Sequence, residues 1–78
     1  MNERQQIIYM QTRMIRLASE EWNKPVEVIT QVFSKYDVLE YMEECFGIFH
    51  VEGDEAVLED IVKFLKNKGV TDHAGISE

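Results

Sequence analysis

Apolar residues recur every three or four positions along most of the chain, which is the spacing of one face of an α-helix. The first such stretch runs from Glu3 to about Trp22, and neither Gly nor Pro interrupts it. Its apolar positions are Ile7, Ile8, Met10, Met14, Ile15, Leu17, Ala18 and Trp22. The pattern predicts one long helix, followed by a break at residues 23–25.

The second predicted helix covers about Pro25 to Lys35. Pro fits the first turn of a helix, where a backbone N–H would have no helical partner. The inner face of this helix holds Val28, Ile29, Val32 and Phe33. Because several of these residues are β-branched and lower the helix propensity, packing against the core must hold this helix in place.

The third predicted helix covers about Val38 to Phe46. The residues expected to turn inward are Val38, Tyr41, Met42 and Cys45. Asp37 is expected to cap the N-terminus, because its spacing to Glu40 matches that of a capping box. Gly47 is placed at the C-terminal stop of this helix.

Residues 48–51, with the sequence Ile-Phe-His-Val, are expected to form a short extended connector before the last helix. They are too few for an independent sheet, and no other segment alternates cleanly between apolar and polar positions. Asp54 is expected to cap the last helix, and Gly69 to end it. The buried stripe of that helix comprises Val57, Leu58, Ile61, Val62, Phe64 and Leu65.

The fold class that follows is all-α: a compact single domain of four helices over residues 1–69, with the first helix longest. Residues 70–78 mix small and polar side chains and are expected to form a disordered C-terminal tail. The chain has 78 residues, which leaves room for one core. A single Cys forms no internal disulfide, and no signal-like segment opens the chain, so we expect a cytoplasmic protein.

Negative charge is concentrated in the second half of the chain. The whole sequence has 15 acidic and 8 basic side chains, for a net charge of −7. Residues 40–60 contain no Lys or Arg, and their carboxylates are Glu40, Glu43, Glu44, Glu52, Asp54, Glu55, Glu59 and Asp60. Such a surface repels nucleic-acid phosphates and anionic membranes, so neither is an expected partner. It favours solubility or a partner with a basic surface.

Few residues in the chain suit catalysis. Cys45 falls at the end of a predicted helix beside Glu43 and Glu44, where both the helix dipole and the carboxylates disfavour the thiolate. The sequence has no glycine motif that would hold a phosphate and no nucleophile elbow. We therefore expect no catalytic residue, no cofactor and no enzyme activity.

A metal-binding or metal-assisted protein that uses the His50 loop is the alternative. His50, Glu52 and Asp54 alternate along the expected connector, so in an extended conformation all three would face one way. The zinc-ligand spacings of structural sites are absent, and we expect no metal ligand. A histidine that holds a loop carbonyl through a ring nitrogen is the simpler interpretation.

The aromatic residues bear on a binding function. One Trp, three Tyr and four Phe are more than a core of this size is expected to hide completely. Phe46 and Phe49 flank Gly47, and an aromatic side chain exposed there among Glu43, Glu44 and Glu52 would resemble a protein contact site. The alternative is that all eight aromatic side chains pack inside.

One segment is similar to a known family. The run Tyr41-Met42-Glu43-Glu44-Cys45-Phe46-Gly47-Ile48-Phe49-His50-Val51-Glu52-Gly53, followed by Asp60-Ile61, resembles the small bacterial proteins called domain of unknown function 3791. The resemblance covers about residues 5–68, and only Gly47 departs from the polar residue expected there. It gives a candidate functional or structural cluster of Tyr41, Glu44, Cys45, Phe49, His50, Gly53 and Asp60. Within this cluster, Asp60 is expected to accept a hydrogen bond from His50 or Tyr41.

The resemblance also implies a protein partner, since members of the family are often encoded beside small proteins of unknown or toxin-like function. Together with the acidic second half and the surplus aromatic residues, it predicts a protein–protein interaction module. The expected partner is another bacterial protein with a basic surface, and the neutralising half of a two-gene toxin–antitoxin-like system is one form of this hypothesis. Self-association into a homo-oligomer is a third possibility beside the metal-binding alternative.

Overall fold

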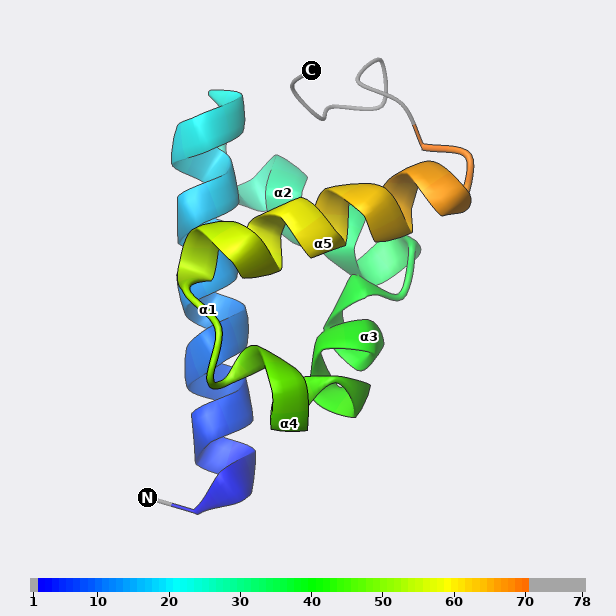
Figure 1. Cartoon of the computed structure of the whole chain (residues 1–78). Coiled ribbons are helices and arrows are strands. Elements are labelled where there is room, and N and C mark those ends of the chain that lie inside the picture. Colours follow the sequence, from blue (N-terminus) through cyan, green and yellow to red (C-terminus); the bar gives the residue numbers. More distant parts are fainter. Residues whose placement is uncertain (1, 71–78) are drawn as a thin grey trace.

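The computed structural model describes residues 2–70, which form five helices and no strand (Figure 1). The helices are α1 (Glu3–Trp22), α2 (Val26–Lys35), α3 (Val38–Glu44), α4 (Phe46–Phe49) and α5 (Asp54–Asn67). The predicted all-α fold is confirmed, although one more helix is present than was expected. Within residues 2–70, none of the helices combines the length and apolarity needed to cross a bilayer.

Helix α1 has the predicted bounds and forms one side of the molecule (Figure 1). A capping box begins it: the Asn2 side chain accepts a hydrogen bond from the Gln5 backbone N–H at 2.8 Å, and the Gln5 side chain accepts one from the Asn2 N–H at 3.2 Å. Asn23 ends the helix in the left-handed conformation, with φ of 54°. The break expected at residues 23–25 is therefore confirmed.

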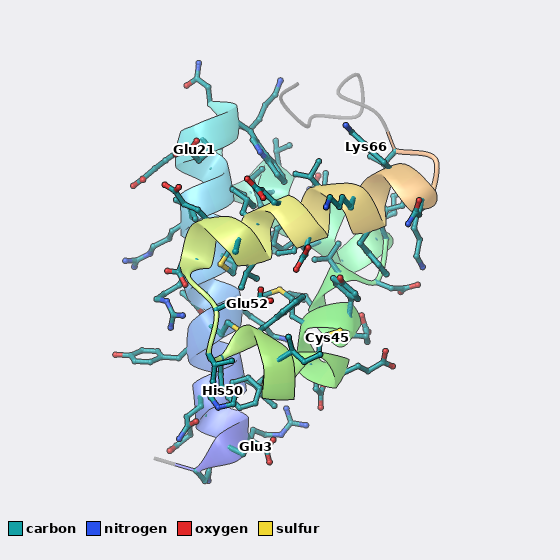
Figure 2. The ribbon with its side chains drawn as sticks, in the orientation of Figure 1. Glu3, Glu21, Cys45, His50, Glu52 and Lys66 are labelled. Carbon is teal, nitrogen blue, oxygen red and sulfur yellow. The ribbon has the colours of Figure 1, made fainter. Side chains whose placement is uncertain are left out.

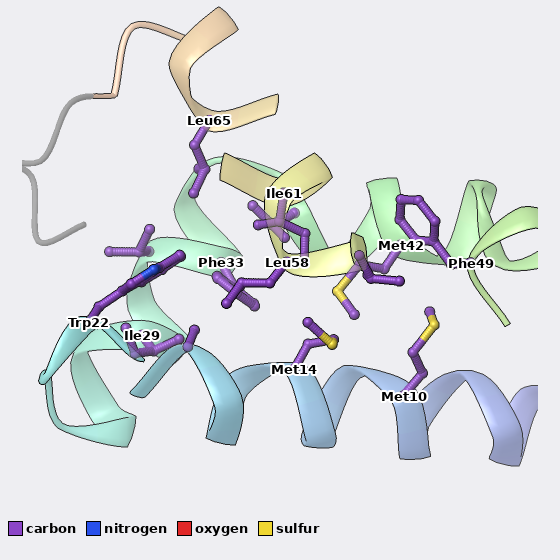
Figure 3. Packing of buried hydrophobic residues seen from close by; sticks show 14 of the residues in the cluster. Met10, Met14, Trp22, Ile29, Phe33, Met42, Phe49, Leu58, Ile61 and Leu65 are labelled. Atoms are coloured by element: carbon purple, nitrogen blue, oxygen red, sulfur yellow. The ribbon is translucent and has the colours of Figure 1, made fainter. Parts of the chain in front are cut away.

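The core lies between α1 and the other helices. The buried face of α1 consists of Ile7, Met10, Met14, Ala18 and Trp22, all at helical spacing. Figure 3 shows Met14 on this face below Phe33 of α2 and Ile61 of α5, and all three side chains are fully buried. Trp22 meets Phe33 edge to face, with ring centroids 6.3 Å apart. These contacts fix α2 and α5 against α1.

The expected extended connector at residues 48–51 is wrong, because the chain makes a fourth helix there. Helix α3 ends at Glu44, and α4 follows as a single turn in which the Phe49 N–H donates to the Cys45 carbonyl at 2.8 Å. Phe46 and Phe49 are both buried, at 7% and 4% exposure. Residues three apart share a face in a helix but lie on opposite faces of a strand, so only a helical turn buries both rings. Gly47 therefore lies inside α4 and ends no helix.

The two expected Asp side-chain caps do not form, although Asp37 does occupy the N-cap position of α3. Asp37 has a left-handed backbone with φ of 64° and makes no side-chain cap, and its carboxylate accepts from Lys68 Nζ at 3.2 Å. Gly53 is the N-cap of α5, so Asp54 is the first residue inside the helix. Its carboxylate is engaged by Arg13 of α1. At this position Asp54 still complements the positive end of the helix dipole.

Gly69 ends α5 as predicted, through a Schellman motif. The Val70 N–H donates to the Leu65 carbonyl at 3.0 Å and the Gly69 N–H to the Lys66 carbonyl at 2.9 Å, with Gly69 at φ of +85°. Val70 is only 2% exposed, so it belongs to the core and not to the predicted tail. The rest of that tail, residues 71–78, lies outside the described residues.

The two glycines Gly47 and Gly69 test this description of the backbone. We expect Gly47→Ala to stabilise the protein by about 0.5–1 kcal/mol, because helical glycine costs that much relative to alanine. A Cβ at Gly47 would meet nothing within 4 Å. Gly69→Ala is expected to destabilise it by about 1–2 kcal/mol, because the Cβ of alanine is strained at the positive φ of this position. Urea unfolding followed by far-UV circular dichroism measures both, and equal losses in the two variants would contradict a helical α4.

Candidate functional site

The structure separates the predicted cluster into two groups. Tyr41 and Cys45 both lie close enough to Asp60 for its carboxylate to raise their pKa values. His50 instead lines a hollow against α1, and Figure 2 shows it on the α1 side of α4, away from Cys45. Gly53 serves as the N-cap of α5. Neighbours in the sequence are thus divided between two sides of the α4 turn.

Tyr41 is the centre of the first group, because its ring joins three helices. It stacks on Phe64 of α5, with centroids 4.0 Å apart and an interplanar angle of 14°. It also meets Phe49 of α4 edge to face at 5.5 Å. The apolar spacing assigns Phe64 only to the buried stripe of α5. Its position four residues after Asp60, on the same face of α5, was the signal that could have found it.

The titratable groups that raise the pKa of Tyr41 are all acidic. The pKa of Tyr41 is raised by burial first, and then by the nearby Cys45, Asp60 and Glu52. The pKa of Cys45 is also raised by burial first, with further contributions from Glu44 and Asp60. A thiol in these surroundings stays protonated at neutral pH, and a protonated thiol is a poor nucleophile.

Glu52 belongs to the Tyr41 group as well, although it is absent from the cluster that the family resemblance gives. It contributes to the raised pKa of Tyr41. Its Oε1 atom is buried and has no hydrogen-bond partner among the described residues. No feature of the sequence distinguishes this glutamate from its exposed neighbours.

The predicted hydrogen bond to Asp60 is wrong for both His50 and Tyr41 in the part of the chain that the structure describes. The Nδ1 atom of His50 lies 2.9 Å from the Phe46 carbonyl oxygen, and the two rings stack with centroids 5.0 Å apart. Because a carbonyl only accepts, Nδ1 is the donor. His50 therefore holds a carbonyl of α4, as the simpler interpretation of this histidine expected.

The three residues of the metal alternative do not converge. His50 faces α1, whereas Glu52 lies near Tyr41. The carboxylate of Asp54 accepts two hydrogen bonds from Arg13, from Nε at 3.2 Å and from Nη2 at 3.1 Å. Over residues 2–70, no group of three or more His, Cys, Asp or Glu side chains is placed to hold a metal ion.

The exposed apolar residues are not the ones expected. Phe46 and Phe49 are buried, while Tyr9 of α1 is 61% exposed, so neither aromatic prediction is right. The exposed apolar side chains at α4 are Ile48 and Val51, at 62% and 74%. They are three residues apart and point outward because Phe46 and Phe49 point inward. We call Ile48 and Val51 the α4 corner.

An open groove of about 300 Å³ lies between α3 and the C-terminal half of α5. We call it the α3/α5 groove, and it is lined by Asp37, Glu40, Tyr41, Glu44, Phe64 and Lys68. Lys68 Nζ lies 5.1 Å from the centroid of Phe64 and 3.2 Å from a carboxylate oxygen of Asp37. Of the predicted cluster, this groove contains Tyr41 and Glu44.

Two of the carboxylates in residues 40–60 are neutralised by α1. Arg4 pairs with Glu43 at 3.8 Å and Arg13 with Asp54 at 3.1 Å. The others form no ion pair with a described residue, and they are Glu40, Glu44, Glu52, Glu55, Glu59 and Asp60. Most of the negative charge of this segment is therefore uncompensated within residues 2–70.

A protein-family model matches residues 9–68 of the chain, and its description is protein of unknown function (DUF3791). The match extends from the first half of α1 to the C-cap of α5, so it includes the Tyr41 group, the α4 corner and the α3/α5 groove. It confirms the resemblance seen in the sequence. Neither a curated protein nor a solved structure matches the chain.

The raised pKa of Cys45 can be measured directly. The rate of alkylation by iodoacetamide rises as the thiol ionises, so its pH midpoint reports the pKa of Cys45. We expect a higher midpoint in the folded protein than in the urea-unfolded chain, because burial and the Glu44 carboxylate disfavour the thiolate. Glu44→Gln should lower the midpoint. Glu43→Gln should leave it unchanged, because Glu43 is not among the causes of the shift.

The same shift has a consequence for stability. Because the folded-state pKa of Cys45 is raised, its contribution to stability is present below the unfolded pKa and is lost as the pH rises through the folded value. Stability should therefore fall on the alkaline side, and less so in Cys45→Ser. Equal alkylation midpoints in the folded and unfolded chain would contradict this description of the thiol.

Proposed function

The chain belongs to the DUF3791 family of proteins of unknown function, and we propose that it is a protein–protein interaction module for a partner with a basic surface. The observation that carries this proposal is the α4 corner. Ile48 and Val51 are 62% and 74% exposed in a protein that otherwise buries its large side chains at α4. Apolar side chains surrounded by charged ones are typical of the centre of a protein contact.

The sign of the partner's charge follows from the carboxylates near this corner. Glu44 and Glu52 flank α4 in the sequence, and neither has an ion-pair partner among the described residues. A partner with Lys or Arg around an apolar patch would complement both features. Electrostatic complementarity of this kind speeds association and excludes acidic competitors, and it weakens as salt is added.

The proposal assigns binding and not catalysis to this surface. The thiol of Cys45 is the candidate nucleophile considered above, and its raised pKa keeps it protonated at neutral pH. His50 uses Nδ1 to hold the Phe46 carbonyl. We therefore infer roles in structure for both side chains.

The neutralising half of a two-gene system in the bacterial cytoplasm is the specific form of this proposal. Neutralisation requires only that one protein cover a surface of another, which a small acidic module can do without chemistry of its own. This form of the proposal predicts a stoichiometric complex with a basic protein encoded nearby. It is supported by the family resemblance and by the uncompensated charge of residues 40–60.

The α4 corner can be tested with a matched control. The partner is captured from a lysate of the source cell at low salt, identified by mass spectrometry and purified, and its affinity is then measured by titration calorimetry. The double variant Ile48→Ser/Val51→Ser should bind at least about tenfold more weakly, because burying each side chain contributes up to about 1.5–3 kcal/mol. Val26→Ser removes an apolar side chain that is 46% exposed on α2, and it should bind like the wild type.

Three results of this experiment would contradict the proposal. One is an affinity that is the same in the wild type and the Ile48→Ser/Val51→Ser variant. Another is a complex that does not weaken as salt is raised, since salt screens the attraction between exposed charges, over a distance of about 10 Å at 0.1 M. The last is recovery of the chain alone at low salt.

A further inference from the structure

The α3/α5 groove has an aromatic floor and a wall of carboxylates. Its floor contains the stacked rings of Tyr41 and Phe64, which are only partly buried. Glu40 and Glu44, four residues apart, lie on one face of α3 and form the wall. Aromatic faces and carboxylates both attract a cation, so the groove combines two features that favour the same kind of ligand.

Lys68 already shows that one end of the groove holds an ammonium group. Its Nζ atom lies 5.1 Å from the Phe64 centroid and 3.2 Å from an oxygen of Asp37. The remaining part of the groove offers the same pair of features in Tyr41 and the two glutamates. Among the described residues, neither Glu40 nor Glu44 has an ion-pair partner.

We propose that the α3/α5 groove binds a Lys or Arg side chain of the partner, with its charged group beside Glu40 and Glu44 and its aliphatic stem on Tyr41. This inference rests on the proposed function and names the chemistry that the partner brings. A long basic side chain suits an open groove of about 300 Å³, because its stem packs on apolar surface while its head stays near the carboxylates.

Other classes of ligand fit the groove less well. A phosphate group would meet the carboxylates of Asp37, Glu40 and Glu44, which repel it. A metal ion would need three or more His, Cys, Asp or Glu ligands placed around it, and the structure places no such group within residues 2–70. A basic side chain needs only the carboxylates and rings that are present.

Lys68 competes with the incoming cation. Its side chain is 36% exposed and that of Asp37 is 62% exposed, so water screens their ion pair and the pair contributes little free energy. Removing Lys68 frees Asp37 and one end of the groove. The partner's side chain would then meet three carboxylates in place of two. The structure therefore assigns Lys68 the role of an internal occupant that sets the affinity of the groove.

The groove can be tested without the partner, with N-acetyl-lysine N-methylamide as the probe. We expect ¹⁵N-resolved NMR titration to show shift changes at Tyr41, Glu44 and Phe64 with this probe, but not with N-acetyl-glutamine N-methylamide. Glu40→Gln/Glu44→Gln should weaken probe binding about fivefold, as expected for two exposed charge interactions. Glu55→Gln/Glu59→Gln makes the same charge change at the same spacing elsewhere and should have little effect.

The competition by Lys68 gives a test in the opposite direction. Lys68→Gln should strengthen binding of the lysine probe by about two- to fivefold, because it removes an exposed ion pair. Lys66→Gln is the matched control, since Lys66 carries the same charge on α5 but is not among the residues that line the groove. A loss of probe affinity in Lys68→Gln would contradict the competition, as would an equal gain in both variants.

Failure of the groove can be distinguished from failure of the proposed function. If the purified partner depends on Ile48 and Val51 but binds Glu40→Gln/Glu44→Gln as tightly as the wild type, the groove proposal is wrong and the interaction module stands. If neither the wild type nor Lys68→Gln shows shift changes in the groove with the lysine probe, the groove proposal is also wrong. Probe shifts in the groove, together with weakened partner binding by Glu40→Gln/Glu44→Gln, would support it.

Discussion

Packing against the buried face of α1 is the constraint on which the rest of the structure depends. A chain of 78 residues can bury one core, and α1 supplies its longest continuous face, in which Met14 and Ala18 are fully buried. Helices α2, α3 and α5 each pack on this face. Their order along α1 in turn sets the path of the chain at α4. Phe46 and Phe49 are both buried there, and a helical turn is the conformation that buries both rings.

The polar flanks of α1 then determine which charges remain free. Gln11 donates to the Leu39 carbonyl of α3 at 3.0 Å, and Arg4 and Arg13 pair with Glu43 and Asp54. These contacts hold α3 and α5 to α1 and neutralise Glu43 and Asp54. The other carboxylates of residues 40–60 have no such partner among the described residues. The acidic surface, the α4 corner and the α3/α5 groove are thus what the packing on α1 leaves exposed.

Helices whose apolar spacing repeats over several turns could be predicted from the sequence, whereas the one-turn helix α4 could not. Helix α1 was predicted with its observed bounds because its apolar spacing recurs along its whole length. Helix α4 was missed because a single turn carries too little periodicity, and Gly47 was interpreted as a stop. The spacing of Phe46 and Phe49 was the available signal. The Asp side-chain caps are absent because Asp37 has a left-handed backbone and Gly53 takes the N-cap position before Asp54. Both carboxylates instead meet cations 31 and 41 residues away in sequence, Lys68 and Arg13.

The candidate site shows the same limit. Tyr41, Cys45 and Asp60 do lie together, as their common position in the family pattern implied. The same family pattern placed His50 with them, but the helical turn directs it to α1. Phe64 and Lys68 complete the groove from the far end of the chain. Only the spacing of Phe64 to Asp60 points to Tyr41, and no local pattern links Lys68 to it. Such partners are defined by tertiary packing alone.

Carboxyl footprinting of the free and partner-bound chain tests the central claim most directly, since that claim concerns which acidic groups a partner covers. Carbodiimide-driven labelling modifies exposed carboxylates, and mass spectrometry locates each modified residue. The account predicts that binding protects Glu40 and Glu44, while Glu21 and Glu27, at the end of α1 and the start of α2, stay labelled as in the free chain. Protection of Glu21 and Glu27 with unchanged labelling of Glu40 and Glu44 would contradict it.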